Sequence, residues 1–193
     1  MTTTQDHSTA PAATIVGRAG TRLAWGSALL FLGVASEWVI NPQRGDGTVL
    51  HPTRFALCVG TSVVGAALLA RGLRDLKTFV PRSRPARFGR AATTAGAVLL
   101  LVSMAAILVT GIVTGTPAGL AFVPWAFGML ALSVGPVVLG TSVLRLHRAF
   151  GASTILAGLT ALASVVIPLD PWHDVSLATM CAAWVAAGLA VRS

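Results

Sequence analysis

The stretch AATTAGAVLLLVSMAAILVTGIV, residues 91–113, decides the fold class. It contains no charged side chain, and it is long enough to cross a bilayer core about 30 Å thick, which takes about 20 residues of α-helix. Its apolar residues do not alternate with polar ones, so the pattern does not suit a strand. An open sheet edge also cannot face lipid, because its backbone groups would be left unsatisfied. The stretch therefore predicts a transmembrane helix.

Five further apolar stretches lie on either side of this one. In chain order they cover residues 23–40, 55–72, 122–144, 149–168 and 175–191. Of the 193 residues, 54% are hydrophobic and 10% are charged, and the mean hydropathy is +0.79. A soluble domain of this length needs far more polar surface. We therefore expect an all-α integral membrane protein, with six transmembrane helices arranged as three antiparallel hairpins.

The segments outside these stretches complete the expected domain organisation. Residues 1–22 are polar and rich in Thr and Ala, which predicts a disordered tail. No early basic segment leads into a short apolar core and a small-residue cleavage site, so the first apolar stretch is expected to stay as a membrane anchor. Residues 23–191 then form one compact bundle, interrupted by a basic loop at 73–90.

Lys and Arg are distributed unequally between the two predicted sides of the membrane. The tail, the 73–90 loop, residues 145–148 and the C-terminus share one side, which holds twelve of the fourteen Lys and Arg residues. By the positive-inside rule, this side and both termini are cytoplasmic. The net charge of +8 lies in short loops beside apolar segments, which argues against nucleic-acid binding. Abundant Arg, Ala, Gly and Val are typical of a high-GC bacterial gene, so we expect a bacterial plasma membrane.

The segment RGLRDLKTFVPRSRPARFGR, residues 71–90, is the most basic part of the predicted cytoplasmic face. Each cation near a membrane surface attracts anionic lipid by roughly 1 kcal/mol. The segment therefore predicts contact with anionic head groups, either as a simple orientation signal with non-specific lipid attraction or as a dedicated docking site. The seven cations concerned are Arg71, Arg74, Lys77, Arg82, Arg84, Arg87 and Arg90.

The opposite, outer face carries most of the residues suited to bind a substrate or an ion. These candidates are Glu37, His51, Arg54, Asp170, His173 and Asp174. An ionisable group at membrane depth is costly and is a functional candidate by default. The alternative for Glu37 is a pair with Arg54 or a cap on a neighbouring helix, and the alternative for the 168–174 loop is a turn with Asp174 or Ser176 capping the last helix. His and carboxylates suit zinc or copper, but no spacing is diagnostic, so no metal and no cofactor is predicted.

Two features within the apolar stretches concern helix shape and packing. Gly135-Pro136 in the middle of 122–144 predicts a kink, because proline removes a backbone hydrogen bond and crowds the preceding turn. Gly111 and Gly115, four residues apart, allow close helix approach. That approach serves either packing within the chain or the face of a homodimer.

No catalytic motif, phosphate-binding loop or intramembrane histidine pair occurs in the chain. This favours a non-enzymatic membrane protein with an accessory, sensing or assembly role. A small transporter or channel using the outer polar group is the first alternative, and it predicts that Glu37 faces the bundle or a water-filled cavity. A membrane enzyme with an outward-facing His/carboxylate site is the second. The expected partners are the lipid bilayer and either a second copy of the chain or another membrane protein.

Overall fold

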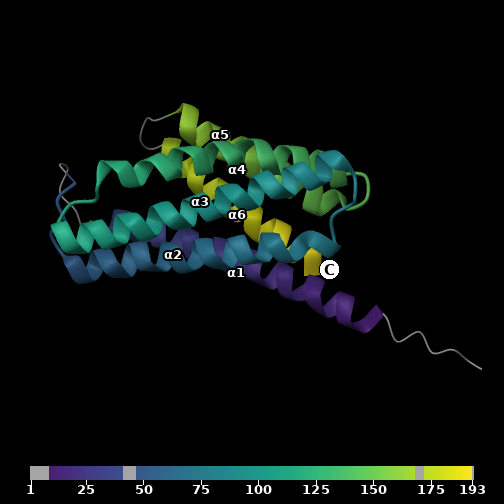
Figure 1. Cartoon of the computed structure of the whole chain (residues 1–193), viewed down its shortest axis with the longest axis horizontal. Helices are drawn as coiled ribbons and strands as arrows, with labels where there is room; N and C mark the ends of the chain where they lie inside the picture. The colour runs from purple at the N-terminus through teal and green to yellow at the C-terminus, as the bar shows by residue number, and fades with distance from the viewer. Residues whose placement is uncertain (1–8, 41–46, 168–171, 193) are drawn as a thin grey trace, which may run out of the picture.

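The computed structural model describes residues 9–40, 47–167 and 172–192. These residues form six α-helices and two short 3-10 helices, with no β-strand in the described ranges, so the predicted all-α fold is confirmed for this part of the chain. The elements are α1 Thr9–Ile40, α2 Pro52–Asp75, η1 Leu76–Thr78, α3 Arg84–Thr114, η2 Gly119–Ala121, α4 Phe122–Val143, α5 Arg148–Val166 and α6 Trp172–Arg192 (Figure 1).

Most of these helices are long and apolar enough to cross a membrane. Five helical stretches meet that condition among the described residues: Pro52–Thr78, Arg84–Thr114, Gly119–Val143, Arg148–Val166 and Asp174–Arg192. The 32-residue helix α1 contains the first predicted apolar stretch, 23–40. The chain is therefore a helical protein with five to six helices able to span a bilayer.

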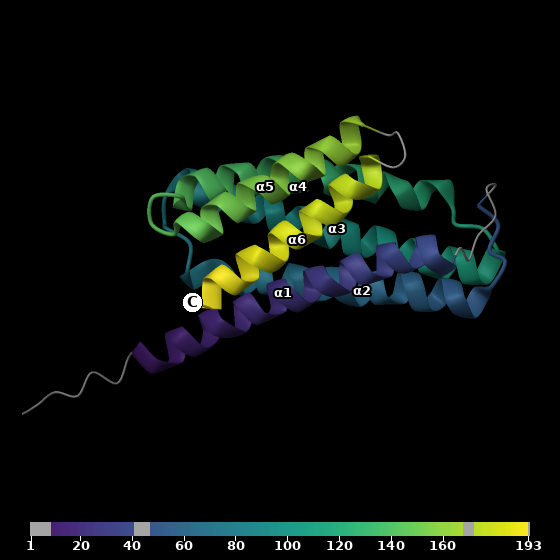
Figure 2. The same cartoon turned by 180° about the vertical axis from the view of Figure 1, so that it is seen from behind.

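Helix α1 begins well before the apolar stretch that it contains. It starts at Thr9, so the expectation of a disordered tail is wrong for residues 9–22, while residues 1–8 lie outside the described part. The end of this early segment packs on the bundle, because Gly20 is buried against α6 and Ala19 is buried beside Gly72 of α2. A Cβ built on Gly20 would lie 2.5 Å from the carbonyl oxygen of Gly188. Figures 1 and 2 show the N-terminal end of α1, in purple, projecting beyond the other helices.

The predicted 73–90 loop is mostly helical, which corrects its boundaries. Helix α2 continues to Asp75, η1 follows at once, and α3 begins at Arg84. Leu73, Leu76 and Val80 are buried, so the segment packs on the bundle instead of looping into solvent. Pro85 lies in the first turn of α3, where its missing N–H would have no helical partner in any case.

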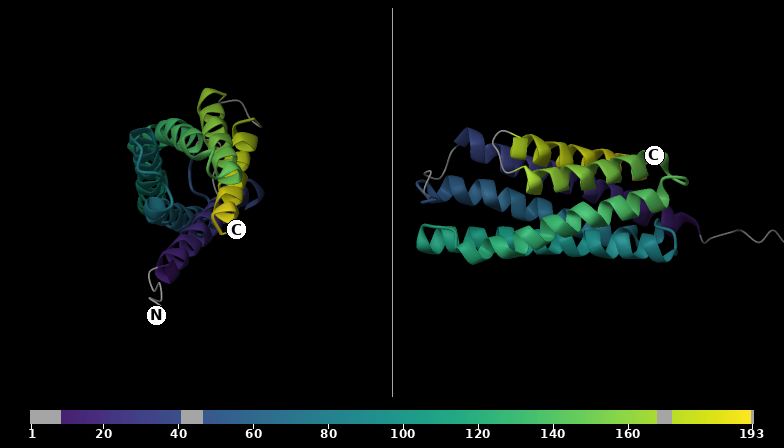
Figure 3. Two further views of the ribbon diagram at one scale, coloured as in Figure 1. Left: turned by 90° about the vertical axis from the view of Figure 1, so that its right-hand side faces the viewer. Right: turned by 90° about the horizontal axis from the view of Figure 1, so that it is seen from above.

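The six helices form a closed ring. Each helix packs against its neighbours in the sequence, and α1 also packs against α6. Within the described ranges, no other pair of these helices comes into backbone proximity. The view along the bundle in Figure 3 (left) shows this ring, with α1 and α6 side by side. Because α1 and α6 meet, residues from the two ends of the chain can contribute to one site.

Apolar side chains fill the ring. The main core includes Leu23, Leu69, Leu132 and Trp184, all at most 1% exposed. Buried hydroxyls in the helices mostly bond to the carbonyl oxygen one turn earlier, as Ser133 does to Met129 at 2.8 Å. These hydroxyls are therefore satisfied within their own helix and do not by themselves indicate a polar path.

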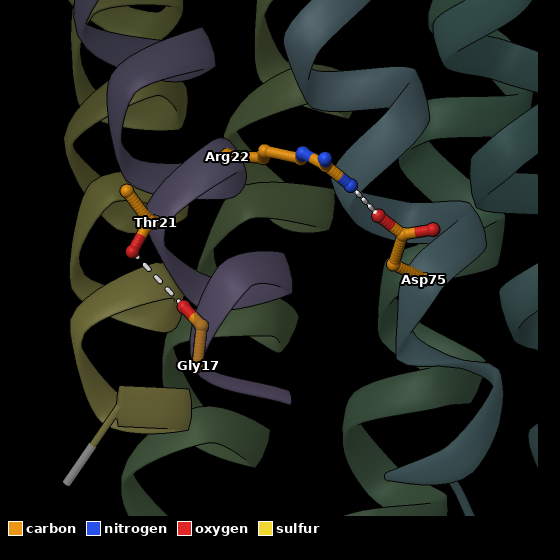
Figure 4. A network of polar contacts seen from close by, with 4 residues as sticks. All are labelled: Gly17, Thr21, Arg22 and Asp75. Carbon is orange, nitrogen blue, oxygen red and sulfur yellow. Dashed lines mark hydrogen bonds and ion pairs between the residues drawn. The ribbon is translucent and has the colours of Figure 1, made fainter. Parts of the chain in front are cut away.

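One ion pair ties α1 to α2. The Arg22 guanidinium donates to the Asp75 carboxylate (Figure 4). One residue before Arg22, the Thr21 hydroxyl donates to the carbonyl oxygen of Gly17 at 2.9 Å. We call the end of the bundle that contains this pair and the α2–α3 connection the basic end. The opposite end, where α1 ends and α6 begins, is the acidic end.

The glycines singled out in the sequence serve contacts within the chain. Gly135 and Pro136 are buried in α4, which runs without a break from Phe122 to Val143, and a Cβ on Gly135 would lie 2.5 Å from the Thr93 amide nitrogen. Gly135 therefore permits close packing of α3 on α4, while the kink stays a prediction. Gly111 packs against the ring of Phe55, and Gly115 ends α3 with a positive φ of 74°.

Candidate functional site

A cavity of about 320 Å³ lies at the acidic end of the bundle. Five of the six helices contribute to its wall, and the two carboxylic acids Glu37 and Asp174 line it together. We call it the acidic cavity, and its lining residues are Val34, Glu37, Ser62, Met104, Phe122, Trp125, Asp174 and Leu177. No Lys, Arg or His belongs to this described lining, so the ionisable groups in it are acids.

The ring closure between α1 and α6 brings the two acids to one cavity. Glu37 lies in the last turn of α1, and Asp174 lies in the first turn of α6. An acidic residue in the first turn of a helix is favoured by the positive end of the helix dipole. Helix α6 begins at Trp172, so neither Asp174 nor Ser176 is its N-cap, which corrects that alternative. Both acids are partly buried.

The floor of the acidic cavity is apolar and narrow. Val34, Met104, Trp125 and Leu177 also border a smaller gap of about 30 Å³ deeper in the ring. That volume holds roughly one water molecule. Leu30, Leu100, Met129, Met180 and Cys181 complete this gap. In this structure the cavity therefore ends on a plug of Leu and Met side chains.

An apolar groove of about 180 Å³ runs beside the acidic cavity, between α1 and α6. It shares Val34, Asp174 and Leu177 with the cavity. Phe31 and Val175, both exposed, supply part of its wall. The carboxylate of Asp174 thus adjoins both an acidic cavity and an apolar groove, which suits a ligand that is cationic at one end and apolar elsewhere.

The other predicted outer-face residues do not join this cavity in the described structure. His51 and Arg54 are exposed at the start of α2 and do not line the cavity. The described residues show no ion pair between Glu37 and Arg54. His173 belongs to the first turn of α6, but its side chain lies outside the described part, and Asp170 lies outside it altogether. No group of three or more His, Cys, Asp or Glu side chains comes together among the described residues.

The chemistry of the acidic cavity favours a cation. Two carboxylates supply negative charge, and the faces of Trp125 and Phe122 attract cations through the ring quadrupole. The Ser62 hydroxyl also lines the cavity, and it donates a long hydrogen bond of 3.4 Å to the Cys58 carbonyl oxygen of its own helix. Two acids with aromatic and Met walls match an organic cation better than a small metal ion, because hard metal ions take six or more oxygen ligands.

Sequence reasoning found the acids but missed the rest of the wall. Trp125, Met104 and Ser62 come from three different helices, and nothing in their local sequence distinguishes them from ordinary packing residues. One feature of the sequence could have indicated Trp125 as a wall residue. It lies near the start of the apolar stretch 122–144, at the same predicted membrane face as Glu37.

The seven basic candidates lie at the other end of the molecule. Six of them, Arg71, Arg74, Lys77, Arg82, Arg84 and Arg87, are exposed, and Arg90 is half-buried. Four of the seven line a recess between the α2–α3 connection and α3.

Comparisons of the chain with protein-family models, with curated protein sequences and with solved structures found no match.

Proposed function

We propose that the chain is a non-enzymatic, multi-pass protein of a bacterial plasma membrane. It crosses the bilayer six times as three antiparallel hairpins, and both termini face the cytoplasm. The distribution of charge supports this orientation, because twelve of the fourteen Lys and Arg residues fall on the predicted inner side. The acidic end then faces outward, and the basic end faces the cytoplasm.

We further propose that the acidic cavity binds a small organic cation that enters from the outer side of the membrane. The observation that carries it is the shared placement of Glu37 and Asp174 in one cavity beside Trp125. Two carboxylates that line one cavity attract a positive charge, and the faces of aromatic side chains add to that attraction. A cation with apolar substituents can meet both carboxylates and also fill the apolar groove. The chain is then a ligand-binding component with a sensing or accessory role.

A transporter is the second candidate, and one specific observation favours it. The acidic cavity and the deeper gap share four lining residues, so they follow one another along the axis of the ring. A transported cation would have to move past the Leu and Met plug. Transport therefore requires a rearrangement of the helices, whereas binding alone does not.

The basic end is proposed to contact anionic head groups of the inner leaflet. Arg71, Arg74, Lys77, Arg82, Arg84, Arg87 and Arg90 would each add to this attraction. Their exposure supports the proposal, because exposed cations can reach lipid phosphates, and Arg90 is the one half-buried member of the set.

Choline and its uncharged isostere 3,3-dimethylbutan-1-ol test the outer site. Calorimetry on the protein in nanodiscs should show choline binding at least about tenfold more tightly than the isostere, since one compensated charge is worth more than about 1.4 kcal/mol in such a cavity. Glu37→Gln and Asp174→Asn should each weaken choline binding about tenfold. Asp75→Asn, which removes an acid at the opposite end, is the control and should leave choline binding unchanged.

Equal binding of choline and its isostere, or full choline affinity in Glu37→Gln, would show that the cavity does not recognise charge. Uptake of labelled choline into proteoliposomes distinguishes the two candidates. Uptake that Glu37→Gln abolishes supports a transporter, while binding without uptake supports the sensing or accessory role.

A further inference from the structure

A recess of about 800 Å³ lies at the basic end, between the α2–α3 connection, the start of α3 and the α4–α5 connection. Four of its lining side chains are cations: Lys77, Arg82, Arg87 and Arg90. We call it the basic recess. Thr78 supplies a hydroxyl, and Leu146 forms an apolar part of the wall. No acidic side chain belongs to this described lining.

The cations of the basic recess are not neutralised by the nearest acid in the sequence. Asp75 is the single acid in the 71–90 segment, and its carboxylate pairs with Arg22 of α1. Arg87 lies in the first turn of α3, which contains no acidic residue. Positive charges gathered in one recess repel one another and raise the local potential, so an anion bound among them relieves this repulsion.

The wall of the basic recess is held in place by packing. Phe79, which lines it, stacks on His147 with ring centroids 4.3 Å apart and meets the edge of buried Phe150 at 5.2 Å. Leu76 and Val80 on either side are in the core. The amide of Val80 donates to the Leu76 carbonyl at 3.1 Å. The cations therefore extend from an ordered frame, which lowers the entropy lost when a ligand binds.

The position of the basic recess favours a lipid over a soluble anion. Helix α3 is one of the helices able to span a bilayer, and Arg87 and Arg90 lie in its first two turns. Phe88 on α3 is 59% exposed, and Leu146 in the wall is 66% exposed. Apolar side chains beside cations at the end of a spanning helix match the boundary between acyl chains and head groups.

We propose that the basic recess binds one anionic phospholipid whose head group carries two phosphates. Four cations in a single recess match two phosphate charges better than one, and Arg holds phosphate oxygens through paired donors. This deepens the proposed attraction of the basic end for anionic lipid and rests on it. The difference is that Lys77, Arg82, Arg87 and Arg90 act together on one bound lipid, whereas the remaining cations contribute only diffuse attraction.

Two triple variants separate the basic recess from diffuse attraction. The recess variant is Lys77→Gln/Arg82→Gln/Arg87→Gln, and the matched control is Arg71→Gln/Arg74→Gln/Arg84→Gln. Each removes three exposed cations from the same segment, so both should keep the melting temperature of the parent. Native mass spectrometry counts bound cardiolipin, which carries two phosphates, and compares it with phosphatidylglycerol at equal total charge.

The parent and the control should each retain one cardiolipin, and the recess variant should bind it at least about tenfold more weakly. Phosphatidylglycerol at equal charge should be retained less than cardiolipin. If both variants weaken equally, diffuse attraction stands and the basic recess is refuted; if neither weakens, both proposals fail. If inorganic pyrophosphate displaces cardiolipin at equal concentration, the recess recognises soluble phosphates, and the lipid assignment is overturned.

Discussion

At the scale of single residues, small side chains decide how closely the helices approach. A Cβ on Gly65 would lie 2.5 Å from the Leu30 amide nitrogen and 2.7 Å from the Gly26 carbonyl oxygen. The neighbours are backbone atoms of α1, which cannot rotate away as a flexible side chain could. Gly65 therefore sets the distance between α1 and α2. Gly60, one and a half turns earlier in α2, is different, because a Cβ added there would have no atom within 4 Å.

The substitutions Gly65→Ala and Gly60→Ala should have opposite effects on stability. Gly65→Ala forces α1 and α2 apart, and we expect the free energy of unfolding to fall by about 1–3 kcal/mol. Gly60→Ala adds a methyl group in free space and improves helix propensity, so we expect a gain of up to about 1 kcal/mol. Denaturant unfolding in one detergent measures both. Equal effects of the two substitutions would contradict the close packing at Gly65.

At the scale of elements, the ion pair between Arg22 and Asp75 links α1 to α2 near the basic end. The two side chains are 31% and 27% exposed, so water screens their interaction only in part. Leu23, next to Arg22, is fully buried and lies against Gly72 of α2, which gives an apolar contact between the same two helices. Burial of apolar surface already stabilises the contact between α1 and α2. The ion pair therefore mainly fixes how the two helices are oriented relative to each other.

A double-mutant cycle on Arg22→Ala and Asp75→Ala should give a coupling energy of about 0.5–1 kcal/mol. High salt should lower this coupling, because the pair is partly exposed. Arg18, one turn before Arg22 and exposed, provides the control. Coupling between Arg18→Ala and Asp75→Ala should be near zero. A cycle in which Arg18 and Arg22 couple equally to Asp75 would show that only the general field of the basic end matters.

At the scale of the whole molecule, charge is separated along the axis of the ring. The acidic cavity lies at one end, the Leu and Met plug lies beneath it, and the basic recess lies at the other end. This separation agrees with the orientation proposed from the Lys and Arg count. Because the inner face of a membrane protein carries more cations, the basic end is expected in the cytoplasm.

Cysteine labelling in whole cells tests this orientation. Cys58 and Cys181 are buried and are first replaced by Ala. Ser83 and Thr116 are exposed at the basic and acidic ends respectively, so Ser83→Cys and Thr116→Cys place a thiol at each. An impermeant maleimide should label Thr116→Cys in intact cells, and Ser83→Cys only after permeabilisation. The reverse result would place the acidic cavity on the cytoplasmic side and overturn the proposed orientation.

Several parts of the fold could be predicted because they depend on local sequence. The apolar length of 91–113 is enough to predict a spanning helix, and α3 covers that range. The helical state of residues 9–22 was not predicted, because that segment is polar, and the packing of Gly20 within it on α6 is a contact between residues far apart in the chain. Homodimer formation, a protein partner and the kink at Pro136 stay predictions, since each depends on features beyond the contacts described within one chain.

The sequence by itself determined that this chain is helical, apolar enough for a membrane and asymmetric in charge. These properties are sums over residues, so hydropathy, length and the position of each Arg suffice to predict them. Only the tertiary structure decided that α1 packs on α6, which places Glu37 and Asp174 in one cavity, and that four of seven cations share one recess. The physical reason is that helix packing depends on steric fit between residues far apart in the chain, such as Gly20 and Gly188, which no local pattern reveals.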